Sequence, residues 1–241
     1  MGKKEIRHLG LVSNGIFLVE RDGNYFVPPF YLRLHEGLLR MFPQVTFYCV
    51  RASADHPYWG PACTAKFDLP NIKIRPVPLR GGRILRGLGQ MLVYWRTLPQ
   101  TDAVCIDLPN ELGFFAALTC RLARRKYFVR VLGNWADNLI HNEPDTFAVR
   151  LKSHLAEWME RTAVSGASLA LFQGQELFSK YAQLQDLKKS DKVHSTLSAE
   201  MFFARQAAAF HTPLRLITVS RLVPLKGLDV LLQAMQFLMK A

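Results

Sequence analysis

The sequence predicts an α/β protein built on a parallel β-sheet. Short apolar or β-branched runs alternate with segments of helical periodicity along most of the 241 residues. The segment from Asp102 to Val131 reads as strand, helix, strand at close to the minimum length, which implies a parallel pair with a right-handed crossover. The segment from Leu214 to Met239 repeats the order of strand, loop and helix. Ligands of such sheets bind at the carboxyl ends of the strands, so polar residues there are the candidates for function.

The composition is that of a globular protein with an excess of positive charge. Hydrophobic residues make up 49% of the chain and charged residues 21%, which argues against disorder. The net charge of +12 favours a polyanionic partner, such as nucleic acid, anionic lipid or a phosphorylated substrate. No apolar run approaches the roughly 18–20 residues that span a bilayer, and the first residues lack a signal-peptide pattern. We therefore expect a cytoplasmic protein, peripheral to the membrane at most.

The cysteines and histidines give no metal-binding pattern. The four cysteines show no C-x-x-C spacing, and the seven histidines form no H-x-H or H-x-x-x-H pair. Cys49 and Cys105 fall in strand-like runs, where a thiol packs as a small hydrophobic group. We expect no metal site and a reducing compartment.

The N-terminal elements predict the first unit of the sheet. In chain order they are a buried strand, a long loop, a helix that stops before Pro43, and a second strand: His8–Ser13, 14–29, Phe30–Met41 and Val45–Val50. Loops after the first strand of such units often contact ligand, so Asn14 and Gly15 are candidate acceptor-binding residues. The alternative is an ordinary surface turn.

An amphipathic helix is predicted from Arg83 to Arg96, after a loop at 51–71 and an outer strand at Ile72–Val77. Its apolar stripe consists of Ile84, Leu85, Leu88, Met91, Leu92 and Trp95. Arginines 80, 83, 86 and 96 border this stripe, a pattern that suits an anionic membrane surface. The alternative is a helix packed on its own sheet, and the sequence does not decide between them. Replacing Arg83 and Arg86 by Glu would test the membrane hypothesis.

The central strand–helix–strand unit supplies three further candidates. The predicted elements are the strand 102–106, the helix Leu112–Arg124 and the strand Tyr127–Val131. Asp107 and Asn110 follow the first strand, and Asn134 follows the second. All three are plausible polar groups in a cleft at the strand ends, with helix-cap or turn roles as the alternative.

The C-terminal part of this domain predicts a long helix, a strand and a short helix, at about 146–163, Ser168–Phe172 and Gln175–Leu184. Four apolar residues of the long helix recur at helical spacing: Phe147, Leu151, Leu155 and Trp158. We interpret them as core residues.

The most specific motif is the run SRLVPLKGLDVLLQA, which starts at Ser220. It joins a predicted strand at 216–219 to a helix, and it places Arg221 and Lys226 on the loop at the strand's carboxyl end. Arg offers a planar fork for two phosphate oxygens, and Lys a movable point charge. Fixed cations at this point would stabilise a departing diphosphate more in the transition state than in the ground state.

This run resembles the opening of the donor domain in retaining GT-B glycosyltransferases of the family-four type, which carry R-L-x-P-x-K-G-x-D-x-L-L-x-A there. The resemblance implies two Rossmann-like domains, with Arg221 and Lys226 as catalytic residues that bind the diphosphate of a nucleotide-sugar donor. It implies front-face attack assisted by the leaving phosphate, no metal or other cofactor, and an acceptor on the N-terminal domain. A lipid-linked or polysaccharide acceptor at the membrane would suit the basic helix. Asp107 and Leu132 occupy places where the family often has histidine.

Two domains are expected: an acceptor-binding domain over 1–203, and a linker with the first strand–loop–helix unit of a donor domain over 204–241. The second part is too small to bury a core, so we expect a truncated domain, lacking the family's later acidic E-x7-E motif and inactive by itself. A competing hypothesis is a non-catalytic basic module that binds polyanions such as RNA. No RNP, KH or helix-turn-helix pattern supports it, and we expect no nucleic-acid partner.

Overall fold

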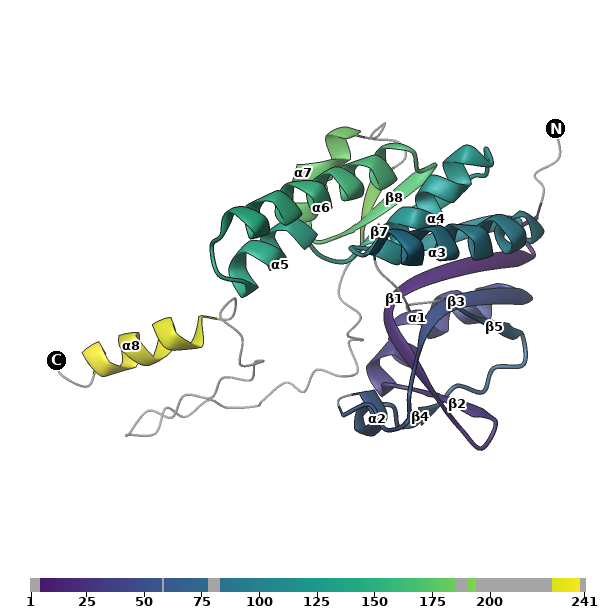
Figure 1. The fold of residues 1–241 in the computed structure, drawn as a ribbon, viewed down its shortest axis with the longest axis horizontal. Helices are drawn as coiled ribbons and strands as arrows, with labels where there is room; N and C mark the ends of the chain where they lie inside the picture. Colours follow the sequence, from purple (N-terminus) through teal and green to yellow (C-terminus); the bar gives the residue numbers. More distant parts are fainter. Residues whose placement is uncertain (1–4, 58, 78–82, 185–189, 194–226, 239–241) are drawn as a thin grey trace, which may run out of the picture. The chain divides into compact units, whose positions relative to one another are not determined.

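The structure is a computed structural model that describes residues 5–57, 59–77, 83–184, 190–193 and 227–238 (Figure 1). The chain divides into two compact units. The first comprises Met1–Asn134 with Trp158–Thr196, and the second comprises Trp135–Glu157 with Leu197–Ala241. The sheet and the candidate site belong to the first unit.

A nine-stranded sheet forms the frame of the first unit in the described residues. Its strands are β1 (His8–Arg21), β2 (Asn24–Val27), β3 (Gln44–Ala52), β4 (Ala65–Lys66), β5 (Ile72–Pro76), β6 (Ala103–Leu108), β7 (Tyr127–Val131), β8 (Leu169–Gln173) and β9 (Ser190–Val193). The parallel strands lie in the order β5-β3-β1-β6-β7-β8-β9. The parallel strands β3 and β5 lie on one side of β1, and β6 to β9 lie on the other. The strand order therefore reverses between β1 and β6, which is the arrangement of a doubly wound α/β fold.

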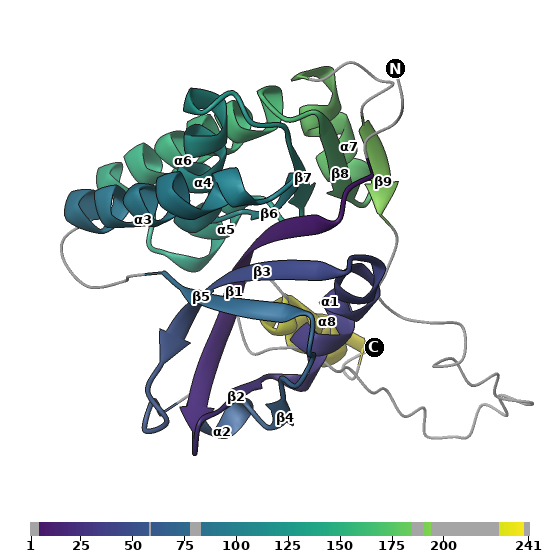
Figure 2. The same cartoon turned by 90° about the vertical axis from the view of Figure 1, so that its right-hand side faces the viewer.

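The described helices are α1 (Pro29–Met41), α2 (Trp59–Ala62), α3 (Arg83–Thr97), α4 (Glu111–Leu122), α5 (Trp135–Asn142), α6 (Phe147–Ser165), α7 (Gln175–Tyr181) and α8 (Leu228–Leu238), with short 3-10 turns at Leu98–Gln100 and Ala182–Leu184. In the first unit, α1 covers one face of the sheet, and α3, α4 and α7 cover the other. Figure 2 shows α3 and α4 side by side, in agreement with their contacts. The predicted helices and parallel strands of the N-terminal domain are therefore confirmed, within a few residues at their ends.

Two apolar layers form the core, one on each face. Because side chains alternate along a strand, Leu9 and Leu11 of β1 point to one layer and Val12 to the other. The layer that holds Leu9 packs against Leu39 of α1. The opposite layer packs against Tyr94 of α3 together with residues of α4, α6 and α7. The strands β3, β6 and β7 are buried on both faces over most of their length, as expected for the centre of a parallel sheet.

The predicted loop over 14–29 is wrong. β1 continues to Arg21, and its pairing with β3 resumes at Phe17 after a register shift. The chain then turns at Asp22 and Gly23, whose φ angles are 50° and 74°, and returns as β2. Asp-Gly is a strong hairpin signal, and the apolar residues before it can pair with both β2 and β3. Asn14 and Gly15 consequently lie inside a strand, at the register shift.

The predicted core role of the α6 stripe is also wrong. Phe147 is 82% exposed, and Leu151, Leu155 and Trp158 are between 50% and 59% exposed. The buried face of α6 carries Val149, Ser153, Ala156, Glu160 and Ala163 instead. The helical periodicity of the sequence shows an apolar face of α6, but a different face packs against the rest of the protein. That face carries smaller side chains and includes the polar residues Ser153 and Glu160.

The second unit contains α5, the first part of α6 and α8. Within it, Ser153 donates a hydrogen bond to the carbonyl oxygen of Ala136 at 3.2 Å, which ties α6 to α5. Leu228–Leu238 is helical as predicted, and none of its residues is buried. The predicted strand at 216–219 and the domain boundary at 203–204 lie outside the described residues.

The four cysteines are free and buried, and burial raises the pKa of Cys120 to about 12. In the described part of the chain, no cluster of histidine, cysteine and acidic residues could hold a metal ion. A search of the same residues finds no helix with the length and hydropathy of a membrane span.

Candidate functional site

A buried polar cluster lies where β6 and β7 end and where β1 stops pairing with β6, and the alternation of side chains explains its position. On the α1 face of the sheet, Leu9 and Leu11 of β1 are followed by Ser13. On the same face, β6 presents Ala103 and Cys105 and then Asp107. In β7, Phe128 of that face is followed by Arg130. Each row therefore changes from apolar to polar at this edge of the β1–β6–β7 pairing.

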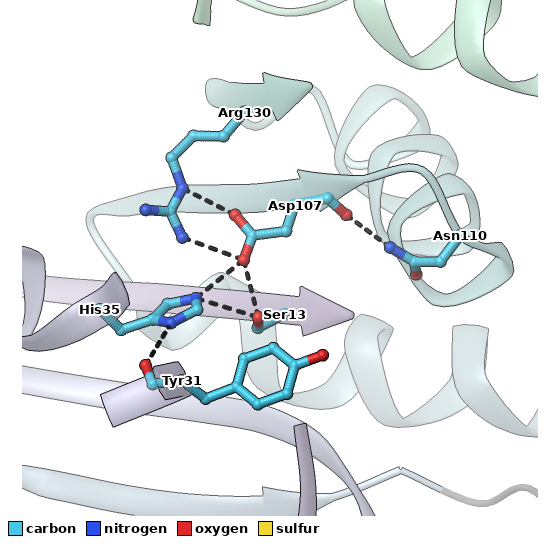
Figure 3. A network of polar contacts seen from close by, with 6 residues as sticks. All are labelled: Ser13, Tyr31, His35, Asp107, Asn110 and Arg130. Atoms are coloured by element: carbon cyan, nitrogen blue, oxygen red, sulfur yellow. Dashed lines mark hydrogen bonds and ion pairs between the residues drawn. The ribbon is translucent and has the colours of Figure 1, made fainter. Parts of the chain in front are cut away.

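Asp107 is the centre of this cluster (Figure 3). Arg130 binds both carboxylate oxygens, with Nε 2.7 Å from Oδ1 and Nη2 3.0 Å from Oδ2. The hydroxyl of Ser13 donates to Oδ2 at 2.7 Å, and Nε2 of His35 lies 2.9 Å from the same oxygen. Ser13, His35 and Asp107 are each 1% exposed and Arg130 is 9% exposed. The carboxylate is thus held by three different segments of the chain.

His35 reaches the cluster from α1, and both of its ring nitrogens face oxygen atoms. Nδ1 lies 3.0 Å from the carbonyl oxygen of Tyr31, one turn earlier, which can only accept a hydrogen bond. Nε2 faces the Asp107 carboxylate at 2.9 Å and the oxygen of Ser13 at 3.0 Å. The ring therefore joins α1 to the two strands that carry Ser13 and Asp107.

The electrostatics favour an ionised Asp107. Burial would raise the pKa of this carboxyl group, but the charge of Arg130 and the hydrogen bonds from His35 and Arg130 outweigh it and hold the pKa well below its usual range. For Arg130, burial opposes the charge, while the charge of Asp107 raises the pKa above its ordinary value. The ion pair between Asp107 and Arg130 is therefore stable across physiological pH.

The arrangement does not have the geometry of a nucleophilic triad. In such triads the carboxylate binds one ring nitrogen of histidine and the nucleophile binds the other. Here Nε2 faces both Ser13 and Asp107, while Nδ1 faces a backbone carbonyl. The hydroxyl also donates directly to the carboxylate. The cluster is better suited to fixing the strands β1, β6 and β7 relative to one another than to activating Ser13.

The site lies at the point where the strand order reverses. β1 and β6 pair in parallel from Leu9 to Val12 and from Ala103 to Ile106, and Ser13 and Asp107 are the next residues of the two strands. Open α/β sheets bind ligands in the crevice outside the carboxyl ends of the strands at this point. The position of the cluster in the topology is thus that of a ligand site.

Asn110 has a structural role at this edge. Its side-chain oxygen accepts a hydrogen bond of 2.6 Å from the backbone N–H of Gly113, which caps α4. Its amide donates to the carbonyl oxygen of Asp107 at 2.6 Å. Asn134 is partly buried and directly precedes α5. Of the predicted acceptor residues, Asp107 and Asn110 are hydrogen-bonded to each other. The part of all five, Asn14, Gly15, Asp107, Asn110 and Asn134, in acceptor binding stays a prediction.

The predicted catalytic residues Arg221 and Lys226 lie outside the described residues. Conversely, the sequence analysis missed Ser13, His35 and Arg130. Their positions are 94, 72 and 23 residues from Asp107, so local patterns do not connect them. One signal was available, because Ser13 and Arg130 each interrupt the apolar row of a predicted strand.

No protein-family model and no curated protein matches the chain. Among solved structures, a UDP-N-acetylglucosamine 2-epimerase from Rickettsia bellii matches at 9% identity with a TM-score of 0.50, over 80% of this chain and 46% of its own. A protein assigned as the same epimerase from Listeria monocytogenes also gives 9% identity and a TM-score of 0.50, over 78% and 45%. A structure of LpCGTa in complex with UDP gives 13% identity and a TM-score of 0.47, over 82% and 56%.

These similarities concern the fold. The two structures with a TM-score of 0.50 support a mixed α/β, mostly parallel, Rossmann-like domain of the GT-B type, as the sequence predicted. The chain spans about 45% of the length of those two proteins. Both of those proteins are named as UDP-N-acetylglucosamine 2-epimerases.

Proposed function

We propose that the chain is the acceptor-side part of a glycosyltransferase that moves a sugar from a nucleotide-diphosphate donor, with retention, to a lipid-linked or polysaccharide acceptor. The observation that carries this proposal is the buried Ser13–His35–Asp107–Arg130 cluster at the reversal of strand order. It joins β1, β6 and β7 at the place where open α/β sheets bind their ligands. The chain's net charge of +12 suits an anionic donor or a phosphate-bearing acceptor.

The donor side of the proposal depends on the run from Ser220. Arg221 and Lys226 are the residues that we assign to the diphosphate, by resemblance to the GT-B motif. Their cationic groups would stabilise the negative charge that develops on the leaving group, while the cluster in the first unit holds the acceptor edge in shape. No metal is required in this scheme. The names of the similar solved structures, which refer to UDP and UDP-N-acetylglucosamine, make a UDP-sugar the first donor to test.

The test is sugar transfer by a protein that contains both this chain and a complete donor domain. Arg221→Ala or Lys226→Ala should lower turnover by roughly 10²–10³, as loss of one charge-stabilising group does. Arg51→Ala is a control, since Arg51 forms an ion pair with Glu20 and takes no part in the cluster around Asp107. Near-normal rates in both motif variants would contradict the assigned roles. Salt-sensitive retention of RNA, without binding of any nucleotide sugar, would favour the polyanion-binding alternative.

We also propose that α3 docks on an anionic bilayer. Its exposed face is apolar: Leu85, Leu88, Leu92 and Trp95 are between 51% and 70% exposed. Arg86 is neutralised by an ion pair with Glu111, but Arg96 is exposed. A basic turn after α4 lies next to the end of α3, because Arg125 donates a hydrogen bond to the carbonyl oxygen of Pro99. The end of α4 and this turn add exposed cations at 121, 124, 125 and 126. Apolar residues that include a Trp and are bordered by cations are typical of surfaces that bind at the interface between a membrane and water.

Flotation with vesicles of phosphatidylglycerol and phosphatidylcholine tests this surface. Leu88→Ser combined with Leu92→Ser should abolish most binding, and Arg96→Glu should weaken it selectively at low salt. Leu151→Ser combined with Leu155→Ser is a matched control on α6, because these leucines have similar exposure. Unchanged flotation of the α3 variant, or loss in the α6 variant alone, would reject α3 as the docking face.

A further inference from the structure

A second polar site lies at the opposite end of the strands, on the other face of the sheet. It is a cavity of about 270 Å³ lined by His8, Gln44, Val45, Thr46, Tyr48, Lys73, Arg75, Thr97 and Gln100. The lining contains two permanent cations and a histidine, and no carboxylate. Its volume is at the lower end of the range for ligand pockets, which suits a small polar group.

The strand register explains why the cations converge. Thr46 of β3 pairs with Lys73 of β5, and Tyr48 pairs with Arg75. Paired residues of neighbouring parallel strands point to the same face, and so do Lys73 and Arg75, which are two positions apart. Tyr48 belongs to the core layer of α3, so this face is the one opposite to Asp107.

The cations of the cavity have no counter-charge in the described residues. No described acidic side chain forms an ion pair with Lys73 or Arg75, although Arg75 is only partly exposed. Elsewhere on the surface, arginines with similar exposure do have partners, as Arg86 has in Glu111. Two adjacent cations in a concave site repel each other, and an anion between them would relieve this repulsion.

The floor of the cavity is rigid. Nε2 of His8 lies 2.8 Å from the hydroxyl oxygen of the buried Thr46, which orients the imidazole ring. The hydroxyl of Tyr48 donates to Thr97 at 2.9 Å, and Thr97 donates to the carbonyl oxygen of Val93 at 2.6 Å. Burial raises the pKa of Tyr48 to about 12, so this hydroxyl stays protonated and neutral. The donors that remain for a ligand in this arrangement are those of Lys73, Arg75 and Gln44.

We propose that this cavity binds a phosphate group, with the Arg75 fork and the Lys73 ammonium as its principal ligands and His8 beside them. The planar guanidinium group of an arginine can bind two phosphate oxygens at once, and the flexible lysine side chain can place its charge beside a third. The site is independent of the cluster around Asp107. His8 and Ser13 flank the part of β1 that pairs with β6, which runs from Leu9 to Val12. At the usual rise of roughly 3.3 Å per residue, they are about 16 Å apart.

The experiment is isothermal titration calorimetry of the chain with two probes, glycerol 3-phosphate and a water-soluble short-chain phosphatidic acid. Lys73→Gln combined with Arg75→Gln should weaken binding by about tenfold or more, as loss of charged hydrogen-bond partners does. The matched control is Arg51→Gln combined with Lys66→Gln, which also removes two cations but from surface ion pairs outside the cavity. Circular dichroism and thermal unfolding report whether each variant is folded, and Arg75→Lys, which keeps the charge but not the fork, should bind with intermediate affinity.

The outcomes separate the sources of the phosphate. Tighter binding of phosphatidic acid than of glycerol 3-phosphate, lost in the cavity variant, identifies a lipid headgroup site next to α3. Equal affinities, again lost in the cavity variant, identify a site for small soluble phosphates. Equal binding by the cavity variant and the wild type, equal weakening in the control, or no binding of either probe by the wild type overturns the proposal.

Discussion

The two ends of the sheet use cationic side chains in opposite ways. At the carboxyl end, Arg130 and His35 are buried and directed at Asp107. At the amino end, on the other face, Lys73 and Arg75 line an open cavity without any carboxylate. A buried charge must be neutralised within the fold, whereas a charge at an open cavity can be neutralised by a ligand. The difference between structural and ligand-binding cations therefore depends on their neighbours more than on residue type.

The strongest test of this contrast is removal of the carboxylate. Asp107→Ala leaves Arg130 and His35 buried without their common partner, which should lower the free energy of unfolding by about 3–5 kcal/mol. Urea denaturation followed by circular dichroism measures the change. A loss below about 1 kcal/mol would mean that water can replace Asp107 as the partner of Arg130 and His35. The cations at the carboxyl end would then not depend on a partner within the fold.

Protonation of Asp107 in acid should also lower the free energy of unfolding. The folded-state pKa of Asp107 lies below the value of about 3.9 in an unfolded chain. The stabilisation by Asp107 is therefore fully present above about pH 5 and is lost progressively as the pH falls through the folded-state pKa. We expect the difference in unfolding free energy between the wild type and Asp107→Asn to shrink from pH 5 to pH 2.5. A constant difference over that range would show that Asp107 does not carry the charge assigned to it.

The smallest effect is expected at the amino end. Lys73→Gln combined with Arg75→Gln removes two charges that have no described partner, so the free energy of unfolding should change by less than about 0.5 kcal/mol without ligand. The same urea titrations measure it. Addition of phosphate should stabilise the wild type and leave this variant unchanged. A large loss of stability without ligand would assign Lys73 and Arg75 a structural role like that of Arg130.

The sequence predicted the frame of the molecule better than its site. Strong periodicity located the parallel strands and most helices, and the Asp107 candidate was correct as a polar group at a strand end. The partners of Asp107 depend on strand order and on the packing of α1, which brings His35 to a strand 72 residues away. No local pattern contains that information.

The errors have a common physical origin. The glycines and prolines after Ser13 predict a loop, but the apolar residues between them pair as strands. The stripe from Phe147 to Trp158 predicts a core face because periodicity reveals an apolar face and not whether a partner covers it. Both properties are decided by segments distant in sequence.

The first turn of α4 sets a geometric limit on the whole carboxyl edge. A methyl group on Gly113 would come within 2.7 Å of the carbonyl oxygen of Asp107 and 2.9 Å of the Leu108 side chain. Only a hydrogen atom fits in that gap, so the first turn of α4 can lie directly against the end of β6. Any larger residue would push the helix and the strand apart, and the strand end that carries Asp107 would have to shift away from its partners on the other face of the sheet.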